Sequence, residues 1–124
     1  MPVRYSNSSV LRWPDRKRVD RALREWAALR AFERDDLLAL GVYGSFVSGN
    51  WGVGSDLDLV AVLSDSSEPF PRRAAAWPLE RLPVPADLLV YTREEFARLL
   101  AREDRFARTL ANDVHWIVWR ASPV

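Results

Sequence analysis

Asp56 and Asp58 are the two side chains whose types and spacing most directly suggest chemistry in this sequence. They stand on either side of one residue at the start of the apolar run from Leu57 to Leu63. Side chains alternate along a strand, so both carboxylates are expected on the same face. Neighbouring carboxylates repel one another unless a cation binds between them. The pair therefore predicts a divalent metal site.

The composition limits which metal such a site can hold. The chain has no cysteine and a single histidine, His115, so it can form neither a thiolate site nor a histidine cluster. Oxygen ligands with open positions suit Mg²⁺ or Mn²⁺, which keep several positions for water and substrate phosphates. The predicted cofactor is therefore Mg²⁺ or Mn²⁺, and the predicted substrate is a metal-bound nucleoside triphosphate.

Gly44 and Ser45 supply the features that a phosphate site needs. They follow the apolar run from Leu37 to Tyr43. Glycine lets the backbone approach a phosphate closely, and Ser45 offers a hydroxyl and N–H donors where a short helix is expected to begin. We expect the β- and γ-phosphates to bind at this turn.

Asp87 is a third candidate carboxylate, at the start of the apolar run from Ala86 to Tyr91. A charged side chain in such a strand needs water or a partner. If this strand lies beside the one after Asp56, Asp87 can help to take a proton from an acceptor hydroxyl. In-line attack on the α-phosphate would then release pyrophosphate. The alternative is an ordinary exposed residue after Pro85.

The spacing of these motifs resembles that of the minimal nucleotidyltransferases of the DNA polymerase β superfamily. Gly44-Ser45, ten intervening residues, Asp56-x-Asp58 and a later Asp87 match that pattern, and the likeness covers about residues 15–120. It implies catalytic and metal-binding roles for three aspartates and nucleotide-binding roles for a glycine and two serines. These residues are Asp56, Asp58, Asp87, Gly44, Ser45 and Ser55.

The same resemblance implies a fold and partners. The expected class is α/β (α+β), a mixed sheet of about four strands flanked by helices. The expected function is transfer of AMP from ATP to a hydroxyl of a partner protein, antitoxin-like beside a small helical HEPN-type ribonuclease; a homodimer is the other expected assembly. Two alternatives stay open. One is a module that binds a nucleotide or a partner without catalysis, and the other is an aminoglycoside-like transferase for small molecules.

One position departs from the family pattern. Members often carry arginine before the glycine that follows the Gly-Ser turn, whereas Ser48 precedes Gly49 here. Arg72 or Arg73 is the candidate replacement for the missing phosphate-facing charge.

The elements that must position these residues follow from periodicity. Pro14-Asp15 predicts a helix start, followed by inward residues at spacings of three and four: Val19, Ala22, Leu23, Trp26 and Leu29. Strands are predicted over 37–43, 57–63, 86–91 and 114–119. A helix over 72–82 must kink or end at Pro78. Thr92 and Glu95 form a capping-box pattern that begins a helix. The alternation in the last strand places Trp116 and Trp119 on opposite faces.

Length and charge bound the function classes. With 124 residues and 48% hydrophobic content, we expect one domain over 15–124 after a loosely ordered arm over 1–14. The 18 basic and 17 acidic side chains nearly cancel, which argues against a domain devoted to non-specific nucleic-acid binding. No run approaches the roughly 20 apolar residues of a membrane span, and no secretion signal is apparent. We expect a cytoplasmic protein.

Overall fold

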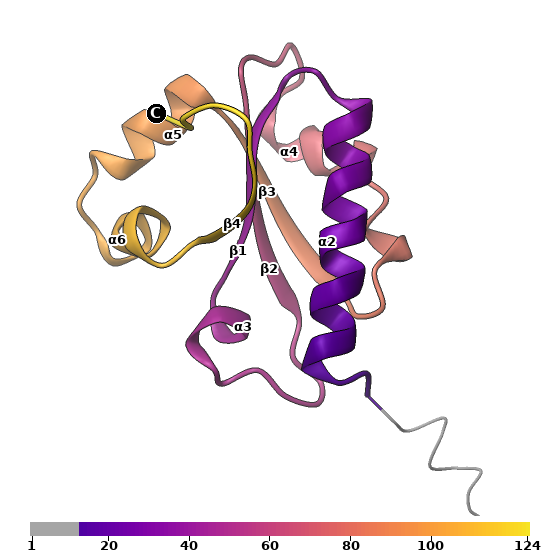
Figure 1. The fold of residues 1–124 in the computed structure, drawn as a ribbon. Coiled ribbons are helices and arrows are strands. Elements are labelled where there is room, and N and C mark those ends of the chain that lie inside the picture. Colours follow the sequence, from indigo (N-terminus) through magenta and orange to yellow (C-terminus); the bar gives the residue numbers. More distant parts are fainter. Residues whose placement is uncertain (1–12) are drawn as a thin grey trace, which may run out of the picture.

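A sheet of four strands in the order β3-β2-β1-β4 lies at the centre of the computed structural model, which describes residues 13–124 (Figure 1). The strands are β1 (Leu37–Tyr43), β2 (Leu57–Leu63), β3 (Ala86–Thr92) and β4 (His115–Trp119). β1 pairs antiparallel with β2 and β4, whereas β2 and β3 are parallel. The expected fold class, a mixed sheet with flanking helices, is confirmed.

Little of the N-terminal arm expected over 1–14 can be assessed, because only Trp13 and Pro14 of it fall within the described residues. Within residues 13–124, every helix is too short or too polar to cross a lipid bilayer.

Helix α2 (Arg16–Glu33) covers one face of the sheet, as its periodicity predicts. Asp15 caps its start by accepting a hydrogen bond from the backbone N–H of Arg18 at 2.8 Å. Leu29, predicted to face inward, is 52% exposed. Arg30 takes the inward position instead, with 3% exposure and its guanidinium 5.3 Å from the ring centroid of Trp26. A cation–π contact therefore replaces an aliphatic one at the end of this helix.

Helices α5 (Arg93–Leu100) and α6 (Arg105–Asn112) cover the opposite face. The predicted capping box is present, since Thr92 Oγ1 accepts from the Glu95 N–H and the Glu95 carboxylate accepts from the Thr92 N–H. Strand β2 is buried between the two layers. Its residues alternate between the core under α2 (Leu57, Leu59, Ala61 and Leu63) and the core under α5 and α6 (Val60 and Val62).

The chain between β2 and β3 forms three short pieces rather than the helix predicted over 72–82. They are α4 (Phe70–Arg73) and the 3₁₀ turns η1 (Ala74–Ala76) and η2 (Leu79–Arg81). Pro78 separates the two 3₁₀ turns, and its carbonyl accepts a hydrogen bond from Trp26 Nε1 at 3.0 Å. The hydrogen bond at this break therefore attaches the crossover to α2.

The placement of Trp116 and Trp119 on opposite faces of β4 is wrong, because β4 contains a bulge. Leu40 pairs with Val118 and Gly41 pairs with Trp116, so Ile117 is an extra residue. The bulge shifts the alternation by one, and the two indole rings meet edge to face with centroids 5.7 Å apart. Both tryptophans thus lie on the face that α5 and α6 cover.

Candidate active site

Two of the predicted carboxylates stand side by side on neighbouring strands. Asp58 in β2 pairs in register with Asp87 in β3, and Tyr43 in β1 pairs with Asp58 from the other side. Neighbouring strands lie about 4.8 Å apart, so these side chains form one row across the sheet. Asp58 shares the alternation of Val60 and therefore lies on the face that α5 and α6 cover. The row is open to solvent, since Asp87 is exposed and Asp58 is half-buried.

Gly44 brings the turn that follows β1 against this row. Its φ of 77° lies in the region that favours glycine. A Cβ atom at this position would also collide with Asp58 Oδ2. Both the backbone conformation and the free space therefore require glycine, and the Asp58 carboxylate lies directly against the turn that follows β1.

The turn continues into helix α3 (Ser45–Ser48), so the predicted short helix after Gly44 is present. The N–H groups of Val47 and Ser48 donate to the Gly44 carbonyl at 3.1 and 3.0 Å. The first N–H groups of a helix have no partner within it, which leaves those of Ser45 and Phe46 for other acceptors. Phe46 is buried and meets the Trp51 ring edge to face, with centroids 5.3 Å apart. This packing anchors the turn to the core.

The charges of the neighbouring carboxylates act on Asp58. Burial, followed by the negative charges of Asp87 and Asp56, raises the pKa of Asp58 above its usual value. Burial also raises the pKa of Tyr43 to about 12, with further contributions from Asp58, Tyr91 and Asp87. Ionisation of Asp58 is therefore less favourable in the protein alone than in water, and a bound cation would offset that cost.

The donor set fits a divalent ion that shares its ligands with a substrate. Among residues 13–124, no three His, Asp or Glu side chains are grouped closely enough to hold a metal ion by themselves. Mg²⁺ commonly binds through one or two carboxylates and completes its shell with water and phosphate oxygens. Asp58 and Asp87, in register and close to Asp56, offer that number of carboxylates. A resident metal would therefore be held here jointly with a triphosphate.

Ser55 and Asp56 lie where the chain enters β2. The Ser55 hydroxyl accepts a hydrogen bond from the Gly52 N–H at 3.2 Å, and the Ser55 N–H donates to the Gly52 carbonyl at 3.0 Å. These bonds close the turn that delivers Asp56, which is exposed. In this structure the Ser55 hydroxyl thus orders the approach to the aspartates.

Neither arginine predicted to replace the missing phosphate-facing charge lies at the site. Arg73 is buried beyond the other end of the sheet, where it donates to the Val90 carbonyl at 3.0 Å and to both carboxylate oxygens of Glu95. Arg72 lines a cavity at that same end, with Leu63 at the end of β2. That prediction is wrong, because the short α4 helix carries both side chains toward the end of β3 that is remote from Asp87.

A different arginine reaches the turn after Gly44. Arg16 Nη2 donates to the Phe46 carbonyl at 2.5 Å, and its guanidinium lies 4.4 Å from the Phe46 ring centroid. Phe46 lies 30 positions after Arg16, and no sequence pattern signals this contact.

A cavity of about 560 Å³ adjoins the glycine turn. It lies between α3 and the end of α6, and a volume in this range accommodates a small organic ligand. Sequence reasoning missed its polar residues because α6 follows the turn only after some 60 residues. The polar lining comprises Ser48, Thr109, Asn112, Asp113 and His115.

Comparisons with known proteins agree with this geometry. The family model described as a nucleotidyltransferase domain matches residues 27–116, which is more than half of the chain. A crystal structure of a protein from Sulfolobus solfataricus, described as a nucleotidyltransferase, has a TM-score of 0.56 and 19% sequence identity over 67% of this chain and 75% of that one. At that identity the likeness shows the fold alone. Among curated proteins, none matches the chain. The chain belongs to the nucleotidyltransferase domain family.

Proposed function

From this family membership, we propose that the chain transfers a nucleoside monophosphate from a nucleoside triphosphate to an acceptor hydroxyl. The observation that carries the proposal is the register of Asp58 beside Asp87, with the Asp58 carboxylate against Gly44. Two carboxylates next to a phosphate-accepting turn are the arrangement that metal-assisted phosphoryl chemistry requires. We also propose that the domain extends over residues 15–124, because α2 packs into the same core as β1 and β2.

Each residue has a distinct part in the proposed reaction. Gly44 leaves room for a phosphate, and the Ser45 hydroxyl and N–H donate hydrogen bonds to it. Asp56, Asp58 and Asp87 would hold Mg²⁺ or Mn²⁺ together with the triphosphate. The ion, when bound, neutralises phosphate charge and favours departure of pyrophosphate. Asp87 is the most exposed partner in the row, so it is the carboxylate that can reach an incoming hydroxyl and accept its proton.

The bonds of the proposed reaction balance without a further reactant. The acceptor oxygen attacks the α-phosphorus, the bond between the α-phosphorus and the bridging oxygen breaks, and pyrophosphate leaves. The hydroxyl proton passes to Asp87 and then to water. The product is a phosphodiester between the acceptor and the nucleoside.

The finer proposal concerns donor and acceptor. We propose ATP as the donor and a hydroxyl of a small helical HEPN-type partner protein as the acceptor, in an antitoxin-like pair. Its support is the motif spacing shared with minimal nucleotidyltransferases, from Gly44-Ser45 to Asp56-x-Asp58. This assignment is separate from the chemistry above, since a fold hosts many acceptors.

The decisive experiment measures nucleotide binding first and transfer second. Calorimetric titration with ATP, GTP, CTP and UTP is run with and without Mg²⁺ on the wild type and on Asp58→Asn. The matched control is Asp35→Asn, which removes the same charge from an exposed position. We expect Mg²⁺-dependent binding that Asp58→Asn weakens and Asp35→Asn preserves.

Transfer is then followed with ATP labelled at the α-phosphate and the co-purified partner. Label on the partner that depends on Asp58 supports the full proposal. Label on a small hydroxyl compound such as an aminoglycoside, but not on protein, would replace the finer assignment. Absence of metal-dependent nucleotide binding with the partner present would show a binding module on a transferase fold.

A further inference from the structure

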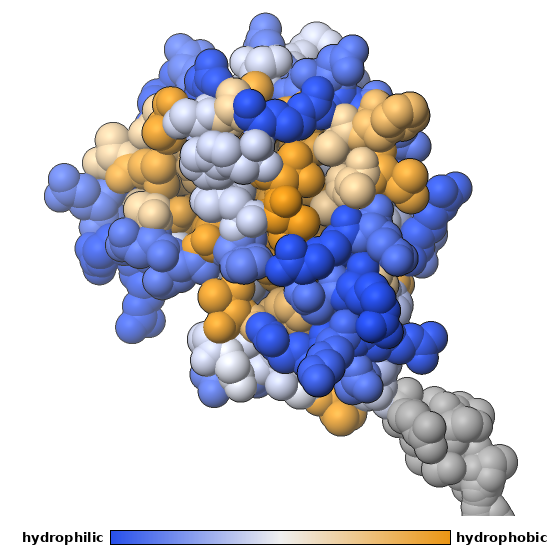
Figure 2. Space-filling view, viewed as in Figure 1, coloured by the Kyte–Doolittle hydropathy of each residue, from blue (hydrophilic) through white to orange (hydrophobic). Residues whose placement is uncertain are grey.

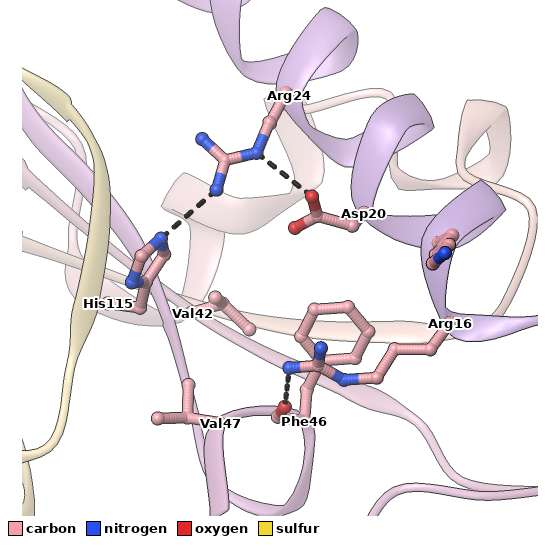
Figure 3. Close-up of a pocket in the computed structure, with 8 residues that line it drawn as sticks. Arg16, Asp20, Arg24, Val42, Phe46, Val47 and His115 are labelled. Carbon is pink, nitrogen blue, oxygen red and sulfur yellow. Dashed lines mark hydrogen bonds and ion pairs between the residues drawn. The ribbon is translucent and has the colours of Figure 1, made fainter. Parts of the chain in front are cut away.

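A second cavity, of about 270 Å³, lies on the α2 face of the sheet (Figure 3). We call it the α2–α3 pocket. Val42 and Phe46 form its floor and belong to the core under α2, whereas Asp58 lies on the other face. The pocket is thus distinct from the carboxylate row. Its polar lining comprises Arg16, Lys17, Asp20, Arg24 and His115.

The pocket carries an excess of positive charge. Three of its side chains, Arg16, Lys17 and Arg24, are cationic and only Asp20 is anionic, which leaves two uncompensated positive charges. Strongly hydrophilic residues accordingly cover the N-terminal half of α2 in Figure 2. An anion placed among these groups would be attracted from several directions at once.

Both arginines of the pocket already make contacts within the protein. Arg16 is tied to the Phe46 carbonyl and ring. Arg24 Nε donates to Asp20 at 3.0 Å, and Arg24 Nη2 lies 3.2 Å from His115 Nε2 (Figure 3). Arginine can only donate, so His115 Nε2 is the acceptor in this contact. Side chains held in this way lose little further freedom when a ligand binds.

Most donors in the pocket have no acceptor among residues 13–124. A guanidinium has five N–H donors, of which Arg24 uses two and Arg16 uses one in the described contacts. Lys17 makes no hydrogen bond or ion pair with another described residue. These donors surround a space equal to about nine water molecules, at roughly 30 Å³ each. A small anion with several oxygens and a partial water shell fits that space.

We infer that the α2–α3 pocket binds a phosphate group. Fixed guanidinium groups match the geometry of phosphate oxygens, and Lys17 adds a point charge. Val47 and His115 line both this pocket and the cavity beside Gly44, so a bound phosphate lies next to the active site rather than within it. The phosphate is either a free ion or part of an ester.

The lone histidine provides a direct probe. The imidazole protons of His115 give a single set of signals in the proton NMR spectrum of the full chain, and His115 lines the pocket. Inorganic phosphate is titrated at fixed pH without nucleotide or metal, with sodium chloride at equal ionic strength as the reference. We expect phosphate to change the chemical shifts of the His115 protons in a saturable way, and chloride to cause no change of that size. An equal response to both salts would overturn the inference.

Variants separate the pocket from the general charge of α2. Lys17→Gln and Arg24→Gln are compared with Arg21→Gln, which removes the same charge from an exposed position on this helix outside the pocket. Phosphate affinity should fall about tenfold for Arg24→Gln and several-fold for Lys17→Gln, and stay within twofold for Arg21→Gln. Lys17→Gln does not disturb the bond between Arg24 and His115. Equal losses in all three variants would overturn the inference.

Two further arms complete the test. In one arm, ribose 5-phosphate replaces inorganic phosphate. Equal affinity for the two compounds identifies the free phosphate ion as a sufficient ligand, and tighter binding of ribose 5-phosphate identifies a phosphate ester as the ligand. Asp58→Asn is titrated in the other arm and should bind phosphate as the wild type does. The phosphate inference therefore does not depend on the proposed transferase activity. Likewise, a failure to bind phosphate in the α2–α3 pocket would not contradict the proposed transferase activity.

Discussion

Strand β3 has an uncompensated negative charge at its start and a fully compensated one just beyond its end. At the start, Asp87 and Asp58 stand in register, and neither forms an ion pair within residues 13–124. Beyond the end, Glu95 forms a two-point ion pair with buried Arg73 and closes the capping box with Thr92. Asp87 and Glu95 lie only eight positions apart along the chain, yet their surroundings are opposite.

The pKa values of Asp58 and Glu95 express this contrast between the two ends of β3. Burial and two neighbouring aspartates raise the pKa of Asp58, whereas the hydrogen bonds from Arg73 lower the pKa of Glu95 to about 2. A compensated carboxylate contributes to folding, whereas crowded carboxylates oppose it until a cation arrives. The contrast agrees with a structural role for the Glu95 end and with the proposed ligand-binding role of the Asp58 end.

The largest expected effect is the loss of activity in Asp58→Asn. Removing this charge from the row should lower the rate of nucleotidyl transfer by about a thousandfold, or roughly 4 kcal/mol in transition-state energy. Single-turnover transfer with saturating Mg²⁺ and nucleotide measures the change. Asp35→Asn serves again as the control. Activity within tenfold of the wild type would remove Asp58 from the catalytic set.

The next effect concerns the stability of the compensated end. Arg73→Met should lower the free energy of unfolding by about 3 kcal/mol, because it leaves Glu95 without its buried partner. Urea unfolding measures this change, with exposed Arg72→Met as the control. The stability due to Glu95 is present above its ordinary pKa and is lost as the pH falls toward about 2. The difference between wild type and Arg73→Met should therefore narrow in acid.

A smaller effect is expected at Gly44, where the backbone of the turn lies directly against the Asp58 carboxylate. Gly44→Ala places a methyl group against the Asp58 carboxylate and forces a residue with a side chain into φ of 77°. We expect a loss of about 1–2 kcal/mol in stability. Thermal unfolding compares this variant with Gly52→Ala, where a Cβ would meet no atom within 4 Å. Equal melting temperatures would show that the turn relaxes without cost.

The smallest expected effect is a gain in stability rather than a loss. In the absence of metal, Asp58→Asn should raise the melting temperature at neutral pH by about 2 °C, since it removes crowded charge from a partly solvated site. The sign follows from the raised pKa. The contribution of Asp58 to stability is present below its ordinary pKa and is lost as the pH rises through the raised value. The advantage of the variant should accordingly vanish in acid, and a variant less stable than wild type at neutral pH would contradict the comparison.

Local patterns predicted the fold well where the interacting residues are close in sequence. The capping box at Thr92 and Glu95 spans three positions, and the helix cap at Asp15 also spans three. The bulge at Ile117 was not predictable, because it depends on how β4 pairs with the distant strand β1. The partner of Glu95 was missed for the same reason, since Arg73 lies 22 residues away.

For the site, the Asp-x-Asp spacing predicted a shared face for Asp56 and Asp58, whereas the neighbouring position of Asp87 required the resemblance to a known family. Alternation determines which face of a strand each side chain occupies, but it does not determine which strand lies next to it. The contact of Arg16 with Phe46 follows from the crossing of α2 over the sheet. No property of the Arg16 region alone reports that crossing.

The parallel pairing of β2 and β3 also determines when the site can exist. A parallel pair needs a long crossover, and here the chain from Ser64 to Pro85 must leave the sheet and return before Asp87 reaches Asp58. Such distant pairings form late, after the local turn at Gly44 has closed. During synthesis the emerging chain therefore presents the phosphate turn first. Asp58 already lies against that turn through the pairing of β1 with β2, whereas Asp87 joins it only when the crossover has docked, so the proposed capacity to bind a metal-bound triphosphate matures with the last stages of folding.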